Sequence, residues 1–316
     1  MHSAQVATAP HARASVGWRI VDALISLRRS RLGLRARKFG PVLLVAPAVA
    51  LVSVLAAGIG FLAWGSVHAY DTFLGLQGKF SLAQYSAIVS DEQFKTDLGR
   101  TLAMASLTAV IAVMLAIPFS LVMAKSRSRF LRLALMVVIF VPYLTGDITR
   151  TFGWLAVLGP HGPLVWICNH IGVQPPDLIG TLWAIGLGTV QVLLPAAVVI
   201  LLPAVLRLDP ELEHAASTLG ARRYRTLFHV TLPQLRLSAF GALTACWALS
   251  IGDFADPQIL GQGIKDYLAN FLQNRYLAIG NPPQGAATGV ILIAIVTIGA
   301  GTILMLGRLR WRRRAL

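Results

Sequence analysis

Four charged side chains interrupt otherwise apolar stretches of this sequence, and their types and spacing could do chemistry. Asp147 and Arg150 lie three residues apart, and Asp253 and Asp256 repeat that spacing. Charged groups in an apolar environment are costly and usually face a protein interior or water. Asp147 and Arg150 can pair with each other at helical spacing, or Asp147 can attract a cationic substrate. Asp253 and Asp256 suit an amine ligand equally well, or they cap and orient the adjacent loop.

Other residue types add little to this chemistry. Aromatic rings could hold a cation by cation–π contact, and the candidates are Trp154, Trp247 and Tyr143. The histidines and the two cysteines do not form a metal-ligand spacing, so we expect no metal site. The sequence contains no Gly-x-x-x-x-Gly-Lys-Ser/Thr phosphate loop, so we expect the chain to bind no ATP and to hydrolyse none itself.

Composition indicates what kind of element must position these charges. The 316 residues are 56% hydrophobic and only 13% charged, with a mean hydropathy of +0.68. A soluble domain carries about 25% charged residues, so an integral membrane protein is favoured. The net charge of +15 could suggest a nucleic-acid partner, but basic loops at one membrane surface explain it as well. We expect lipid contacts and no nucleic acid.

Apolar runs predict six membrane-spanning helices and no strands. About 20 apolar residues cross the hydrocarbon core as a helix, and each run is long enough. The expected spans are residues 41–64, 98–124, 133–158, 180–206, 237–255 and 285–306. The fold class is therefore an all-α membrane bundle.

Basic residues predict the orientation of the bundle. Residues 1–40, 125–132, 207–236 and the segment after 307 hold 22 of the 28 Lys and Arg. The positive-inside rule then places both termini in the cytoplasm. We divide the chain into a basic cytoplasmic extension (1–40), a transmembrane domain (41–308) and a basic tail (309–316).

The segment 209–233, between the fourth and fifth spans, predicts two short helices with a turn between them. Asp209 can cap the first helix and Pro210 suits its first position. Gly220 allows a sharp change of direction, and Pro233 lies where the second helix runs into the fifth span. This polar, cytoplasmic segment is either a solvated loop or a surface for another protein.

The same segment resembles the conserved cytoplasmic loop of ABC importer permeases, known as the EAA motif. Ala215 and Ala216 stand at the two alanines, and Gly220 stands at the glycine. Val230 is at the later apolar position and Leu232-Pro233 at the end. His214 occupies the glutamate position, with Glu213 just before it. The residues expected to couple to an ATPase are Glu213, His214, Ala215, Ala216, Gly220, Ala221, Arg222, Val230, Leu232 and Pro233.

Three further stretches are similar to the spermidine/putrescine type of permease. They are 142–145 with 150–154, 252–257 with 260–261, and 270–274 with 281–287. The resemblance implies a type I importer fold in the inner membrane of a bacterium. It also implies two ATPase subunits that use ATP, a second and paralogous permease, and a periplasmic binding protein. Residues expected along the substrate path are Asp147, Arg150, Trp154, Asp253 and Asp256.

Other functions remain open at this point. Relatives of this type also move aminoethylphosphonate, opines or iron, so the cargo is less closely determined than the family. A secondary transporter would usually show an internal repeat, and a membrane-embedded enzyme would show paired catalytic groups at one depth. Neither signal is apparent, so we expect a transport subunit and not an enzyme.

Overall fold

The computed structural model describes residues 31–71 and 75–312, and the side chains of 45–70 and 79–307. The chain divides into two compact units, residues 1–61 and 62–316. Most of the predicted basic extension and the last four residues of the tail lie outside the described residues.

The first unit and the start of the second share helix α2 (Arg31–Ser66), which contains the predicted first span. Its segment Val45–Ser66 is apolar and long enough to cross a membrane. Val49, Leu51 and Leu55 are exposed, as expected of side chains that face lipid.

A short hairpin follows α2 and departs from the all-helical prediction. Strands β1 (His68–Asp71) and β2 (Gly75–Phe80) pair antiparallel, with His68 opposite Phe80. Strands of four and six residues are too short to show a periodic pattern in the sequence. Helix α3 (Ala83–Ser90) comes next, and the Tyr70 hydroxyl donates to the carbonyl of Gly280 over 2.9 Å.

The core of the second unit forms where α4 (Glu92–Lys125), α8 (Leu182–Leu206) and α11 (Leu232–Ile251) pack together. Small side chains allow helix backbones to approach closely in a membrane. One face of α4 consists of fully buried alanines at helical spacing, namely Ala105, Ala109, Ala112 and Ala116. With 34 residues, α4 spans about 50 Å and reaches both ends of the bundle.

The third predicted span is not one straight helix. Helix α5 (Arg129–Leu144) ends at Leu144, and α6 (Asp147–Leu158) with α7 (Pro163–Ile171) continues at an angle of 108°. Pro142 weakens the last turn of α5, and Thr145 and Gly146 have extended backbones that break the helix. Asp147 therefore stands in the first turn of α6, where the helix dipole favours a carboxylate.

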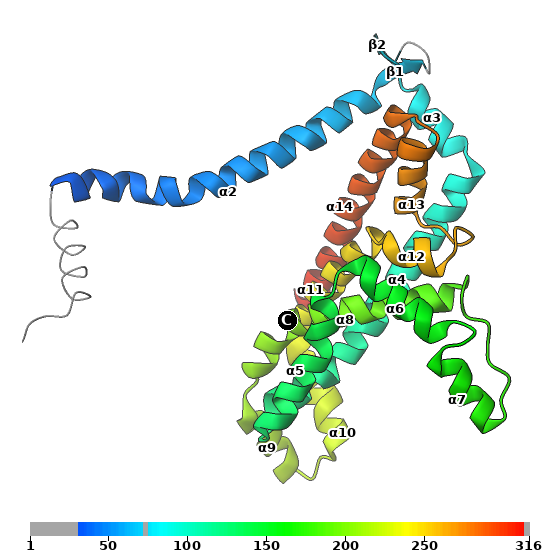
Figure 1. The fold of residues 1–316 in the computed structure, drawn as a ribbon. Coiled ribbons are helices and arrows are strands. Elements are labelled where there is room, and N and C mark those ends of the chain that lie inside the picture. Colours follow the sequence, from blue (N-terminus) through cyan, green and yellow to red (C-terminus); the bar gives the residue numbers. More distant parts are fainter. Residues whose placement is uncertain (1–30, 72–74, 313–316) are drawn as a thin grey trace, which may run out of the picture. The chain divides into compact units, whose positions relative to one another are not determined.

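The remaining elements connect and complete the bundle. Between α8 and α11 lie α9 (Pro210–Thr218), α10 (Arg223–Thr226) and the π-helix η1 (Leu227–Thr231). After α11 come α12 (Ala255–Leu260), α13 (Leu268–Gln273), the π-helix η2 (Asn274–Ala278) and α14 (Pro282–Arg312). Figure 1 shows α9 and α10 at the end of the second unit opposite to α3 and the hairpin.

Within the described residues, four helices are long and apolar enough to cross a membrane, and a fifth span arises if the bent pair counts as one. The four helices correspond to the first, second, fourth and sixth predicted spans, and the bent pair corresponds to the third. The predicted fifth, 237–255, differs most: α11 starts at Leu232 and ends at Ile251, so Asp253 follows the helix. Gln234 and Arg236 in its first turns make α11 more polar than the others.

Candidate functional site

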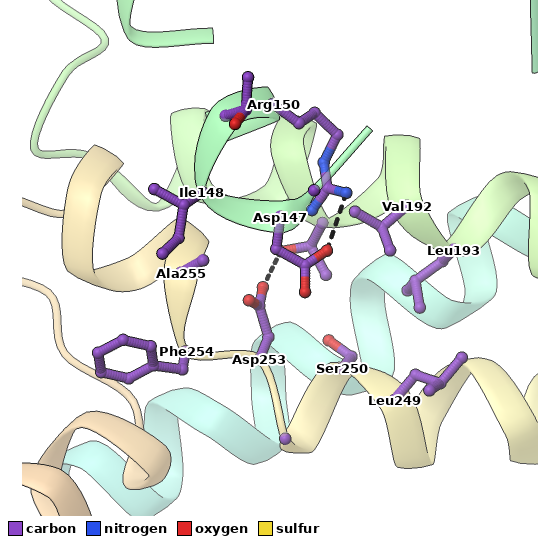
Figure 2. Close-up of a pocket in the computed structure, with 14 residues that line it drawn as sticks. Asp147, Ile148, Arg150, Val192, Leu193, Leu249, Ser250, Asp253, Phe254 and Ala255 are labelled. Atoms are coloured by element: carbon purple, nitrogen blue, oxygen red, sulfur yellow. Dashed lines mark hydrogen bonds and ion pairs between the residues drawn. The ribbon is translucent and has the colours of Figure 1, made fainter. Parts of the chain in front are cut away.

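A cavity of about 610 Å³ lies where α6, α8 and α11 meet, and three of the five residues expected along the substrate path line it. These are Asp147, Arg150 and Asp253. Figure 2 shows Asp147 and Asp253 among the side chains around the cavity, with the Phe254 ring on the side away from Leu249. Its charged wall thus combines two carboxylates with one guanidinium.

Asp147 and Arg150 form an ion pair, with Arg150 Nη1 3.0 Å from Asp147 Oδ1. The two side chains differ sharply in exposure, because that of Asp147 is 74% exposed and that of Arg150 only 6%. The pair therefore joins an accessible carboxylate to a buried guanidinium. The Nε of Arg150 is buried and has no hydrogen-bond partner within the described residues.

Asp253 follows the end of α11 and is held by a neighbouring helix. Its Oδ2 accepts a hydrogen bond of 2.9 Å from Thr189 Oγ1 of α8. Its Oδ1 accepts a long bond of 3.4 Å from the amide of Asp256, in the first turn of α12. Asp253 therefore lines the cavity and also orients the loop into α12, which is the second of the two roles that the sequence left open.

Asp256 lies in the wall behind the cavity and does not line it. It is fully buried, and Thr151 Oγ1 donates to its Oδ1 over 2.6 Å. Gly188 of α8 makes room for it, since a Cβ on that glycine would lie 2.9 Å from the Asp256 carboxylate. Asp256 thus joins α6, α8 and α12, which is a structural arrangement.

The aromatic side chains considered for cation–π contact lie elsewhere. Trp154 donates its indole N–H to Gln191, and Trp247 donates to Ser106 over 3.2 Å. Neither ring, nor that of Tyr143, lines the cavity.

The structure adds residues to the cavity that the sequence did not indicate. Thr189 and Phe254 line it, together with Thr149 and Ser250. An isolated threonine in an apolar helix carries no sequence signal for a site. Phe254 directly follows Asp253, and only the helix break at residue 252 brings it to the cavity.

The two short helices predicted for residues 209–233 are present, at the end of the second unit that lies opposite to α3 and the hairpin. Asp209 Oδ1 accepts a hydrogen bond of 2.9 Å from the amide of Glu211, which caps α9 as expected. Gly220 has a φ of 77°, and the amide of Ala221 donates to the carbonyl of Ala216 over 3.0 Å. These features form a Schellman turn, which ends α9 and reverses the chain.

Glu213 connects this segment to the end of α4. Lys125 Nζ lies 2.6 Å from Glu213 Oε2, and Thr231 Oγ1 donates to Glu213 Oε1 over 3.0 Å. The hydrogen bond from Lys125 is the main cause that holds the pKa of Glu213 below its ordinary value. The bond from Thr231 acts in the same direction, while partial burial opposes both. His214, one position on, is exposed.

The other residues of the loop motif divide between surface and interior. Exposed positions are Ala215, Gly220 and Arg222, and half-buried ones are Ala216, Ala221, Val230, Leu232 and Pro233. Large apolar side chains also reach the surface here, including Leu219, Tyr224 and Phe228. The segment therefore presents an apolar and basic surface, while Glu213 attaches it to Lys125 of α4 and to Thr231.

Comparison with known proteins identifies the family. The model for "Binding-protein-dependent transport system inner membrane component" matches residues 116–312. The chain is 27% identical over 260 residues to the inner membrane ABC transporter permease protein YdcU of Escherichia coli (strain K12), covering 78% of this chain and 82% of YdcU. It is 28% identical over 222 residues to the spermidine/putrescine transport system permease protein PotB of the same strain, covering 69% and 79%.

A solved structure shows the same fold. It is a bacterial alginate ABC transporter in complex with an alginate pentasaccharide-bound periplasmic protein. One of its chains matches with a TM-score of 0.70 and 15% identity, covering 90% of this chain and 98% of that one. Since the family model matches more than half of the sequence, this chain belongs to the inner-membrane components of binding-protein-dependent transport systems and is an ABC transporter permease subunit.

Proposed function

We propose that this permease carries a polyamine such as putrescine or spermidine through the cavity beside Asp253. One observation supports the cargo above others: the charged lining of the cavity is Asp147, Asp253 and Arg150. With all three ionised, one negative charge is in excess, which favours a cation. Asp253 is the better candidate for the amine, because Asp147 already pairs with Arg150.

The relatives agree with a cationic cargo without requiring it. PotB is named for spermidine and putrescine, whereas the structural relative binds alginate. The cargoes named for relatives of this chain therefore differ, and the charge of the cavity lining is the feature of this chain that favours a cation. The alternative cargoes are an aminoethylphosphonate, an opine or ferric iron. The same importer class would carry them.

We propose that all six predicted spans cross the inner membrane, with α11 as the fifth and the bent α5–α6 pair as the third. The basic segments 125–132 and 207–236 lie at the end of the unit that carries α9, which supports a cytoplasmic position for that end. Both termini are then cytoplasmic.

We propose that two ATPase subunits dock on residues 209–233 and supply the ATP hydrolysis. The exposed Leu219, Tyr224 and Phe228 provide an apolar contact surface there, and the exposed Arg222 adds positive charge. A second, paralogous permease and a periplasmic binding protein complete the importer. ATP-driven movement of α9 would pass through Glu213 and Lys125 to α4, and the bundle would alternate between cytoplasmic and periplasmic openings.

Uptake measurements test this proposal. Labelled putrescine and spermidine are supplied to cells that carry the chain, to cells that lack it, and to cells with Gly220→Pro. We expect uptake to fall in both altered strains. One lacks the permease, and in the other Gly220→Pro breaks segment 209–233, on which the ATPase is proposed to dock. If uptake of both amines is unchanged without the chain, the polyamine cargo is wrong, and labelled aminoethylphosphonate, an opine and ferric iron are tested next.

A further inference from the structure

A second polar cavity, of about 440 Å³, lies beside the first, and Phe254 lines both. Its polar lining comes from α12, from the loop before α13, from α13 itself and from η2. The polar residues are Gln258, Asp266, Asn270, Gln273 and Asn274. A cavity lined by one carboxylate and four amides offers many hydrogen-bond acceptors and a single negative charge.

Asn270 is already committed to the fold of this cavity. Its Nδ2 donates to the main-chain carbonyl of Phe254 over 3.2 Å and to Gln258 Oε1 over 3.0 Å. Its Oδ1 accepts from the amide of Tyr267 over 3.2 Å. Asn270 therefore shapes the wall and fixes Phe254, and it leaves the binding of a ligand to other residues.

Asp266, Gln273 and Asn274 have unused hydrogen-bonding groups. The Oδ1 of Asp266 is buried and has no hydrogen-bond partner among the described residues. Arg100, the nearby cation, donates to the main-chain carbonyl of Asp266 over 2.9 Å and to Asp97 over 3.2 Å, but not to the Asp266 carboxylate. A buried carboxylate oxygen without a donor is costly, and an ammonium group bound at the cavity-facing side of the same carboxylate would offset that cost.

We propose that this second cavity, which we name the outer site, binds a primary ammonium group, with Asp266 as its anionic partner and the Gln273 and Asn274 carbonyls as further acceptors. The site would hold the cargo before it passes Phe254 and reaches Asp253. This inference rests on the proposed polyamine cargo, but it concerns a different cavity and different residues. Burial raises the pKa of the Asp266 carboxyl, and a bound ammonium group would act in the opposite direction.

A cysteine reporter on the outer site tests the proposal. Leu277 lines the cavity, is 68% exposed and takes no part in the suggested hydrogen bonds, so Leu277→Cys can report occupancy. Ile264, 65% exposed and away from the cavity lining, gives a matched control as Ile264→Cys. Both are made in a full-length chain with Cys168→Ser, since Cys168 is partly exposed and Cys246 is buried.

The labelling is measured with N-ethylmaleimide on spheroplasts of the native cell that carry the whole importer. Putrescine and spermidine are the probes, and butane-1,4-diol is the neutral control. We expect both amines, but not the diol, to slow labelling of Leu277→Cys severalfold and to leave Ile264→Cys unchanged. Asp266→Asn should raise the half-protecting concentration about tenfold, the effect of losing one charge-assisted hydrogen bond.

Two further variants separate the outer site from the cavity beside Asp253. Asp177→Asn removes an exposed carboxylate that lines a different cavity, and it should leave protection intact. Asp253→Asn should also leave protection at Leu277→Cys intact. The immunoblotted amount of each variant in the membrane checks that it folds.

Each contrary result has a definite meaning. If the chain imports polyamines but the amines do not protect Leu277→Cys, the outer site is wrong and the polyamine cargo stands. If Asp266→Asn is protected as well as the unaltered chain, Asp266 is not the anionic partner and the proposal fails. If the amines are neither imported nor protective, the cargo is wrong and the outer site falls with it.

Discussion

The Nζ of Lys125 lies 2.6 Å from both carboxylate oxygens of Glu213, although the two residues are 88 positions apart. This contact ties the α9 segment to the end of the longest helix of the second unit, α4. At the other end of α4, which begins at Glu92, the side chain of the preceding Asp91 caps the helix and pairs with Arg275. One helix thus joins the α9 segment to the elements beside η2.

The Glu213–Lys125 pair predicts a coupling defect. Glu213→Gln and Lys125→Met should each lower the uptake rate at saturating cargo more than they raise its KM. The double exchange Glu213→Lys with Lys125→Glu should recover part of the rate. Glu211→Gln, an exposed acid on the same helix without this partner, is the control. Equal uptake by Glu213→Gln and the unaltered chain would show that this contact does not transmit movement.

The same pair predicts a pH effect on stability. Since the folded-state pKa of Glu213 is lowered, its contribution is complete above the ordinary carboxyl value of 4.5 and disappears as pH falls through the lowered pKa. Solvent screening at this half-exposed pair limits the effect to below about 1 kcal/mol. The difference in melting temperature between the purified chain and Glu213→Gln should therefore be present at pH 7 and vanish in acid. A difference that persists in acid would contradict this account.

The left-handed backbone of Gly220 leads to a prediction about strain in segment 209–233. A residue with a side chain at its φ of 77° is strained by about 1 kcal/mol, although no neighbouring atom would clash with a Cβ. Gly220→Ala should therefore lower ATP-driven uptake and leave the amount in the membrane unchanged. Gly241→Ala, a helical glycine of α11 that also has open space, should have no effect. A loss of uptake in Gly241→Ala alone would reverse the assignment.

The close approach of Gly188 to the buried Asp256 leads to a prediction about the stability of the fold. Gly188→Ala would push a Cβ to 2.9 Å from that carboxylate and disturb its bond with Thr151. Overpacking of this kind costs about 1–3 kcal/mol, so the melting temperature of the purified chain should fall. Gly186→Ala meets the flexible end of Met104 at 3.2 Å and Thr108 at an ordinary contact distance of 3.8 Å, and it should be tolerated better. Equal melting temperatures for the two variants would show that Asp256 is free to move.

Local chemistry made the structure of segment 209–233 predictable from the sequence. The cap at Asp209, the first-turn Pro210 and the reversal at Gly220 each depend on residues close in the chain, and all three are confirmed. Long apolar runs likewise located α4, α8 and α14. Such features follow from neighbours in sequence or from composition alone.

Contacts between distant elements explain what the sequence could not predict. The break at Thr145 and Gly146 lies inside an apolar run, so hydropathy suggested a single helix from 133 to 158. Asp253 lines the cavity, whereas Asp256 is buried behind it. The two carboxylates are held by Thr189 and Thr151, which come from other helices. The pairing of Glu213 with Lys125 likewise requires the packed bundle. Only the three-dimensional structure assembles such sites.

The hydrogen bond from Thr189 to Asp253 leads to a prediction about the KM for cargo. Thr189→Val keeps the shape of the side chain and removes the 2.9 Å hydrogen bond to Asp253. The loss of one hydrogen bond of about 1 kcal/mol should raise the KM for cargo about fivefold and leave the maximal rate near its original value. Thr297→Val, which removes only a bond to the carbonyl of Ile293, is the control. An unchanged KM would show that Asp253 needs no support from α8.

The most direct test of a cationic cargo recognised at Asp253 is the concentration dependence of putrescine uptake in cells carrying Asp253→Asn, Asp253→Glu or the control Asp177→Asn. We predict that Asp253→Asn raises the KM at least about tenfold, that Asp253→Glu recovers part of it, and that Asp177→Asn has no effect. Equal KM values for Asp253→Asn and the unaltered chain, at equal amounts in the membrane, would contradict the account.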